Sequence, residues 1–205
     1  MKFIVSSSTL LKSLQKISGV ISSNTVLPIL EDFLFKVEDG KLNVFATDLE
    51  TSMSTELSVE AKENFSIAIP AKILMDILKT LPEQPISISV DEVSFGIEIT
   101  SDNGKYKLAG ENGEDFPKMP TEQDASEITI PANILSNAVN KALFAVSNDE
   151  LRPAMTGMLW QFNEDGMVFV ATDAHKLVSY ERKDIKGGNG NSIIVHKKAL
   201  NLLKS

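Results

Sequence analysis

The chain has 205 residues, of which 42% are hydrophobic and 23% charged, and this composition is that of a soluble globular protein with one large domain or two ordinary ones. It has no cysteine and no apolar run long enough for a signal peptide or a membrane span, which excludes a disulfide framework and favours a cytoplasmic protein. The formal net charge of −8 would by itself argue against a polyanionic partner.

Four segments have the periodicity of amphipathic helices, and an apolar tripeptide rich in β-forming residues precedes each of them. Ser8 is the expected N-cap of the first helix, and Pro70 and Pro131 suit first helical turns because no N–H is needed there. The predicted helices are 9–19, 71–81, 132–145 and 197–205, and the tripeptides are 3–5, 67–69, 128–130 and 193–195. Period-2 alternation predicts strands at 33–37, 41–47, 51–59, 86–90, 93–99 and 104–109.

Each predicted helix has one apolar face, opposite a face that is basic or neutral polar. The expected core positions are Leu10, Leu11, Leu14, Ile17, Ile73, Leu74, Ile77, Leu81, Ile134, Leu135, Ala138, Ala142, Ala199, Leu200 and Leu203.

The chain also repeats itself. The stretch from Leu27 to Asp48 has an echo from Leu151 to Asp173, at an offset of about 125 residues, which indicates duplicated domains rather than a solenoid. Because Asp48 and Asp173 occupy equivalent places, we expect them to share a structural role at a strand end rather than to act as catalytic carboxylates. The elements predict an α+β fold with antiparallel sheets: one domain at 1–120, a linker at 121–127 and a second domain at 128–205.

Charge is distributed unevenly between the predicted helices and the rest of the chain. The four helices carry eight lysines and one acid, so that they sum to +7 while the remainder sums to −15. If the helices share a surface, its local field would attract phosphate whatever the total charge. One alternative is that these lysines are ordinary solvated surface residues. A second is that the chain is an acidic interaction scaffold that does not bind DNA.

Several of these segments, in order and spacing, resemble the bacterial DNA polymerase III beta subunit family, the DNA sliding clamps. The resemblance covers the whole chain and rests on Met1-Lys2-Phe3, Leu10-Leu11-Lys12, Ser18-Gly19, Leu27-Pro28-Ile29-Leu30, Ala46-Thr47-Asp48-Leu49-Glu50, Asp115-Phe116-Pro117, Thr156-Gly157 and Ala171-Thr172-Asp173-Ala174-His175-Lys176-Leu177. It implies the DNA-clamp fold: a ring of six similar domains, three per protomer, with helices lining the hole and sheets outside. It also implies a processivity factor that encircles duplex DNA without sequence preference and has no chemistry of its own.

The resemblance further implies three sites. Residues facing double-stranded DNA would be Lys12, Lys16, Asn24, Lys72, Lys79, Lys141, Lys197 and Lys198. A groove for linear motifs of the replicative polymerase alpha subunit, the clamp loader and other clamp-motif proteins would comprise Met155, Thr172, Ala174, His175, Lys176 and Leu177. A head-to-tail homodimer interface would include Lys105, Tyr106, Lys107 and Leu108. The chain departs from the family where it has Asn24 in place of a frequent arginine, and where Ala174 and Lys176 replace the usual glycine and arginine.

An enzyme is not expected from these residues. Two histidines and no cysteine make a poor zinc site, and the glycine-rich stretch 187–192 lacks the lysine of a phosphate-binding loop, so we expect no metal and no cofactor. The chain ends just inside the fourth helix, so we also expect that the third clamp domain is absent and that this chain alone does not close a ring.

Overall fold

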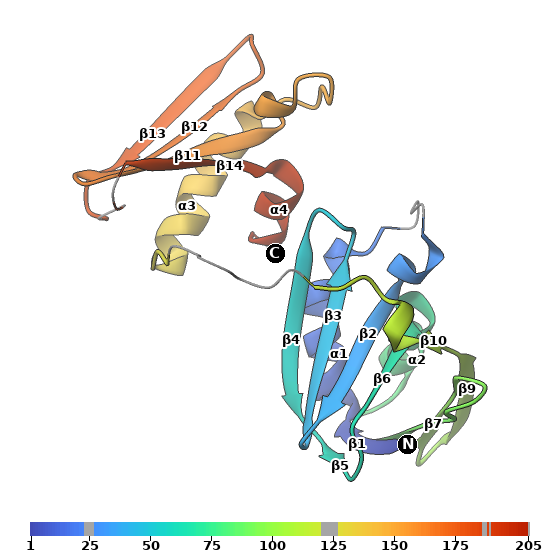
Figure 1. Ribbon diagram of the computed structural model, residues 1–205. Helices are drawn as coiled ribbons and strands as arrows, with labels where there is room; N and C mark the ends of the chain where they lie inside the picture. Colours follow the sequence, from blue (N-terminus) through green and yellow to red (C-terminus); the bar gives the residue numbers. More distant parts are fainter. Residues whose placement is uncertain (23–26, 120–126, 186–187, 189, 205) are drawn as a thin grey trace. The chain divides into compact units, whose positions relative to one another are not determined.

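The computed structural model describes residues 1–22, 27–119, 127–185, 188 and 190–204, and the chain divides into two compact units, Met1–Pro120 and Thr121–Ser205 (Figure 1). Most of the predicted linker at 121–127 lies outside the described residues. Each unit is described by itself.

Unit 1 contains two antiparallel sheets of five strands among its described residues. The first has the order β5-β1-β7-β8-β9, from Glu60–Ala61, Lys2–Ser6, Pro85–Val90, Gly96–Ser101 and Gly104–Ala109. The second has the order β10-β6-β2-β3-β4, from Glu111–Asn112, Phe65–Pro70, Asp32–Glu38, Lys41–Thr47 and Ser52–Ser58. The prediction of a strand at 93–99 was wrong at its start, because residues 91–95 form a turn in which the Asp91 carboxylate accepts from the backbone N–H groups of Val93 and Ser94.

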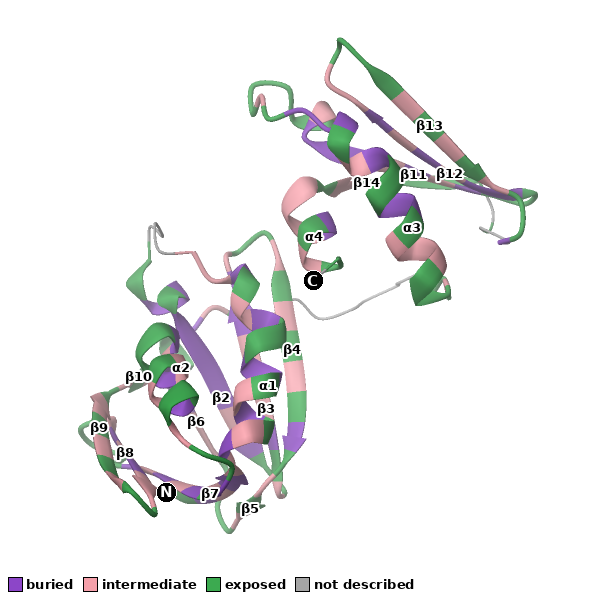
Figure 2. Cartoon of the chain, turned by 180° about the vertical axis from the view of Figure 1, so that it is seen from behind, coloured by how far each residue is buried: buried purple, intermediate pink, exposed green. Residues whose placement is uncertain are grey.

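Two helices, α1 (Ser7–Ile17) and α2 (Ala71–Thr80), contact each other and cover the same face of the second sheet (Figure 2). α1 packs on β3 and β4, and α2 packs on β2 and β6. The N-cap of α1 is Ser6 rather than the predicted Ser8: the Ser6 hydroxyl accepts from the backbone N–H of Thr9 at 3.4 Å, which satisfies one free donor of the first turn.

The apolar faces of these helices were largely predicted correctly. Leu10, Leu14 and Ile17 of α1 are buried, as expected. In α2 the expectation for Ile73 was wrong, since its side chain is 53% exposed. The buried stripe runs through Ala71, Leu74 and Leu78 instead, because steps of three and four residues return to the same side of the helix. The predicted core residues Leu11, Ile77 and Leu81 are only half-buried.

A small apolar cluster covers the opposite face of the second sheet. Leu34 of β2 and Ala68 of β6 are directly opposite in register, and Ile29 and Phe116 pack against them from outside the sheet. Ile29 belongs to the 3-10 helix Pro28–Glu31, and Phe116 follows the 3-10 helix Gly113–Asp115. We call Ile29 and Phe116 the outer cover of unit 1.

Unit 2 has a four-stranded antiparallel sheet in the order β13-β12-β11-β14, with helices α3 (Ala132–Ala142) and α4 (Lys197–Leu202). The strands are Leu177–Arg182, Gly166–Thr172, Gly157–Asn163 and Asn191–His196. The tripeptide 128–130 does not form a strand, contrary to prediction, whereas 193–195 lies within β14.

The core of unit 2 joins both helices to the sheet. Ala138, Val139 and Ala142 of α3 and Leu200 of α4 are buried in one cluster with Trp160. Ile134 and Leu135 are partly buried against it, as predicted. The expectation for Leu203 was wrong, because it is more than half exposed, and Ala199 is half-buried.

Candidate functional site

Four lysines lie on the outward sides of α1 and α2, which pack side by side. Lys12 and Lys16 are exposed on α1, and Lys72 and Lys79 are exposed on α2. The ammonium group of Lys79 lies 3.1 Å from the carboxylate of Asp76, one turn earlier. Among the described residues no carboxylate pairs with the other three lysines, so their charge is available to an anion.

The lysines of unit 2 differ in their surroundings. Lys141 is exposed in the last turn of α3. Lys197 and Lys198, at the start of α4, are half-buried. The ammonium group of Lys197 donates to the side-chain oxygen of Asn148, and its backbone N–H donates to the carbonyl of Thr156 at 3.0 Å. Lys197 is therefore held against the loop after α3. Asn24, also predicted to face DNA, lies outside the described residues.

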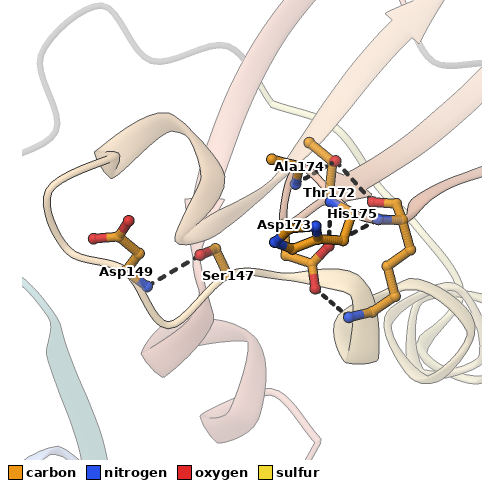
Figure 3. Close-up of polar contacts among 7 residues, drawn as sticks. Ser147, Asp149, Thr172, Asp173, Ala174 and His175 are labelled. Atoms are coloured by element: carbon orange, nitrogen blue, oxygen red, sulfur yellow. Dashed lines mark hydrogen bonds and ion pairs between the residues drawn. The ribbon is translucent and has the colours of Figure 1, made fainter.

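The segment Thr172–Leu177 forms a tight turn at the end of β12 (Figure 3). The Thr172 hydroxyl donates to the carbonyl of Lys176 at 2.8 Å and accepts from the backbone N–H of Ala174 at 3.1 Å. One carboxylate oxygen of Asp173 accepts from the backbone N–H groups of His175 (3.0 Å) and Lys176 (2.9 Å). The turn is thus fixed by two side chains that bond the backbone around them.

The electrostatics of this turn centre on Asp173. The Lys176 ammonium group pairs with its carboxylate, and this bond, helped by the two backbone donors, holds the pKa of Asp173 well below its usual range. Lys176 is therefore engaged within the turn. His175 and Leu177 are exposed beside it.

Unit 1 contains the same turn at the end of β3. The Thr47 hydroxyl bonds the Thr51 carbonyl and the Leu49 N–H, and the Asp48 carboxylate accepts from the N–H groups of Glu50 and Thr51. The prediction that Asp48 and Asp173 share a structural role at a strand end is confirmed.

Sheet register brings Met155 to the same end of unit 2 as this turn. β11 starts at Gly157 and runs antiparallel to β12, whose last residue is Thr172, so the residues before β11 and after β12 meet at one end of the sheet. Met155 ends the 3-10 helix Pro153–Met155 and is half-buried. The structure therefore gathers the six predicted groove residues at one end of unit 2.

Sequence reasoning missed the loop 147–152 beside this site. The backbone N–H of Ser147 donates to the carbonyl of Met155 at 2.9 Å, and the Arg152 guanidinium donates to the Asp149 carboxylate at 2.8 Å. Leu151 at its tip is 92% exposed. An isolated apolar residue in a polar loop has no periodicity to signal it, and only the repeat that starts at Leu151 marked this place in the sequence.

The predicted interface residues form most of strand β9, which is an edge strand of the first sheet in the described part of unit 1. Lys105 and Lys107 are exposed on one face, and their ammonium groups lie 2.9 and 3.8 Å from the Glu98 carboxylate. The bond from Lys105 is the main cause of the lowered pKa of Glu98. Tyr106 and Leu108 alternate with them and are half-buried.

Within the described ranges, no three His, Asp or Glu side chains are grouped so that they could hold a metal ion. None of the helices described has the length and apolar composition needed to cross a membrane.

Comparison with known proteins assigns both units. Residues 1–120 match the family model of the DNA polymerase III beta subunit, N-terminal domain, and residues 129–205 match that of its central domain. The beta sliding clamp of Synechocystis is 30% identical over 95% of this chain and 52% of its own length, and that of Vibrio cholerae is 32% identical over 86% and 48%. The chain thus spans about half the length of the curated relatives it matches.

Solved structures agree with this assignment. The DNA polymerase sliding clamp of Bacillus subtilis covers the whole chain with 27% identity and a TM-score of 0.93, and the DNA polymerase III subunit beta of Pseudomonas aeruginosa does so with 30% identity and a TM-score of 0.92. In each case the match covers 56% of the solved chain. The α+β fold predicted from the sequence is confirmed, and the chain belongs to the DNA polymerase III beta subunit family.

Proposed function

We propose that this chain provides DNA-facing helices and a protein-binding groove of a sliding clamp, the processivity factor of a replicative DNA polymerase. The observation that carries the proposal is the side-by-side placement of α1 and α2 with Lys12, Lys16 and Lys72 exposed and unpaired by carboxylates of the described residues, in a chain of net charge −8. Membership of the beta subunit family across both units supports it.

The chemistry of these side chains suits sliding. A clamp must hold duplex DNA while it moves, which requires weak phosphate contacts that do not depend on sequence. Lysine supplies a point charge on a flexible stem, whereas bidentate readers of base edges would halt the movement. No bond of the substrate is made or broken in this role, so the chain acts as an accessory subunit and not as a catalyst.

The site at the end of the unit 2 sheet is proposed to bind linear motifs of the polymerase alpha subunit, the clamp loader and other clamp-motif proteins. Met155 and Leu177 offer apolar contact, and His175 offers hydrogen bonds on a turn that Thr172 and Asp173 hold rigid. A Pseudomonas aeruginosa sliding clamp that is 29% identical has been solved bound to griselimycin, with a TM-score of 0.89.

Strand β9 is proposed as one side of a head-to-tail homodimer in a cytoplasmic, DNA-encircling ring. An edge strand presents unpaired backbone N–H and C=O groups, which a strand of another protomer can complete. The domain boundaries proposed for the clamp are 1–120 and 128–205, joined by 121–127.

Fluorescence anisotropy with two labelled duplexes of unrelated sequence, titrated with salt, tests the DNA role. We expect equal affinity for both duplexes and a steep loss of binding as salt rises. Absence of binding at low salt would favour an acidic interaction scaffold that does not contact DNA. In the full-length clamp, retention on circular DNA and its loss on linearisation would test the ring.

A further inference from the structure

One carboxyl group in unit 1 is buried without a counter-charge. Asp32, the first residue of β2, is only 6% exposed, and within the described residues its Oδ2 atom has no hydrogen-bond partner. A charged carboxylate in this state is costly, because its Oδ2 atom has lost its hydration without gaining a donor from the described residues. Its neutral form carries a much smaller penalty.

Two further acidic residues lie near Asp32, one placed by the register of the sheet and one by the sequence. Asp32 and Leu34 are two residues apart on β2, so they point to the same face of the sheet. Leu34 is opposite Ala68 of β6, and Ala68 is opposite Glu111 of β10, so the Glu111 side chain emerges on that face as well. Glu31 immediately precedes Asp32. Among the described residues, the charges of Glu111 and Glu31 act on the Asp32 carboxyl, and no lysine or arginine is found beside them.

The β6 residue opposite Asp32 offers no backbone N–H donor to the buried carboxyl group. Asp32 is opposite Pro70, which has no N–H to donate. Burial is the main cause of a raised pKa for Asp32, to about 7, and the charges of Glu111 and then Glu31 add to it. The protonation state of this carboxyl therefore changes near neutral pH.

This is also the face that carries the outer cover. Ile29 and Phe116 pack on Leu34 and Ala68, next to Asp32 and Glu111 in register. The backbone N–H of Asp32 also donates to the carbonyl of Ile29, which ties the 3-10 helix Pro28–Glu31 to the start of β2. Movement of this cover would expose the same face of the sheet to water, and an ionised Asp32 would gain hydration there.

We propose that Asp32 is a proton-operated latch under the outer cover of unit 1: the neutral carboxyl keeps Ile29 and Phe116 packed on the sheet, and loss of its proton favours opening of the cover. Phe116 lies a few residues before 121–127, so opening would release the end of unit 1 from which the chain continues. The closed state prevails at lower pH and the open state gains population as pH rises.

The direction in which opening changes with pH follows from the linkage between proton binding and opening. The raised pKa means that the closed state binds the proton more tightly than an opened, hydrated state does, so closure weakens as pH rises from the ordinary carboxyl range towards 7 and levels off above it. For a closed-state pKa of about 7 and an ordinary value when open, the opening equilibrium should rise about tenfold between pH 6 and pH 8.

Hydrogen–deuterium exchange of the whole chain, corrected for the intrinsic effect of pH on amide exchange, tests this. For the amides of 28–32 and 113–118, we expect the opening equilibrium measured by exchange to rise about tenfold from pH 6 to pH 8. The amides of β7 and β8 should change little. In Asp32→Asn, which keeps the size but cannot ionise, the pH dependence should vanish. In Glu111→Gln the rise should shift to lower pH, because one repulsive charge is gone.

Two controls keep the test decisive. Glu56→Gln removes an exposed carboxylate that pairs with Lys41, and it should leave the pH dependence of both segments unchanged. Carbon-13 NMR of the unmodified chain follows the Asp32 carboxyl directly, so the test does not require that any variant folds. An Asp32 carboxyl that titrates at its ordinary value, or opening that does not change between pH 6 and pH 8, would overturn the proposal.

Discussion

Leu49 and Ala174 adopt the same left-handed backbone conformation, with φ of 77° and 74°, at equivalent positions of the two repeated turns. Each directly follows an aspartate. The Asp48 carboxylate accepts from the backbone N–H groups of Glu50 and Thr51, and the Asp173 carboxylate accepts from those of His175 and Lys176. The side-chain bonds of the turn offset the steric cost that a Cβ atom incurs in this region. The duplication therefore preserved a backbone geometry as well as a sequence motif.

Replacing Ala174 by glycine should stabilise unit 2. Glycine removes the clash at positive φ, which costs about 1 kcal/mol, but it adds freedom to the unfolded chain, so we expect a net gain of up to about 0.5 kcal/mol by chemical denaturation. Ala109→Gly, at an exposed strand position with ordinary φ, is the matched control and should lower stability. A loss of stability in Ala174→Gly would show that the turn is not strained.

Acid should weaken the turn that contains Asp173. Folding depresses its pKa, so its ionised form stabilises the folded state above the ordinary carboxyl pKa, and that contribution is lost as pH falls through the depressed folded value. Asp173→Asn removes the charge and the pair with Lys176. Thermal unfolding should show the variant less stable than the wild type at pH 7, with the gap closing on acidification. A gap that does not change with pH would contradict this account.

Gly157 should not tolerate a side chain. A Cβ atom there would lie 2.7 Å from the carbonyl oxygen of Val195 and 2.6 Å from a methyl carbon of Ile194, and the backbone of β14 cannot move without breaking its pairing with β11. We expect Gly157→Ala to destabilise unit 2 by about 1–3 kcal/mol in denaturant unfolding. Gly96→Ala is the control, because a Cβ there meets only the Ser94 hydroxyl at 3.2 Å. Equal stability of the two variants would contradict the packing argument.

Sequence periodicity predicted the helices and most strands because each buries one regular face, as Leu10 and Leu14 of α1 show. It failed where tertiary context decides between equivalent patterns. Ile73 is as apolar as Leu74, but only the sheet below α2 determines which side is covered. The tripeptide 128–130 has the composition of a strand but pairs with no strand in the described part of the chain.

In the candidate site, too, features set by local sequence were predicted and features set by tertiary contacts were not. The repeat of Thr47-Asp48 as Thr172-Asp173 predicted a shared turn, because local hydrogen bonds follow from local sequence. The bond from Lys197 to Asn148 joins residues far apart in the chain, and no spacing rule would have indicated it. Lys197 was predicted to face DNA, and in the structure its ammonium group donates to Asn148.

Lysines of α1 and α2 should set the salt dependence of DNA binding. If each contacts one phosphate, Lys12→Ala and Lys72→Ala should each reduce the slope of log affinity against log salt by about 0.9, for any duplex sequence. Lys62→Ala is the matched control, because it removes an exposed lysine from the connection between β5 and β6. Equal slopes for all three variants would show that the helix faces do not bind the duplex.

The proposed groove predicts a separation of binding from stability. Leu177 is 67% exposed, so Leu177→Ala should change the unfolding free energy by less than about 0.5 kcal/mol, whereas losing its apolar contact with a bound motif should cost about 1–2 kcal/mol, or about 5–30-fold in affinity. Calorimetric titration of a clamp-motif peptide measures the affinity.

Val93→Ala removes a comparably exposed apolar side chain from unit 1 and should leave peptide affinity unchanged. Met155 is half-buried, so Met155→Ala should lower both affinity and stability, and Leu177→Ala is the cleaner probe. If Leu177→Ala and Val93→Ala bind the peptide as tightly as the wild type, the motif does not contact Leu177, and the groove must be sought elsewhere on unit 2.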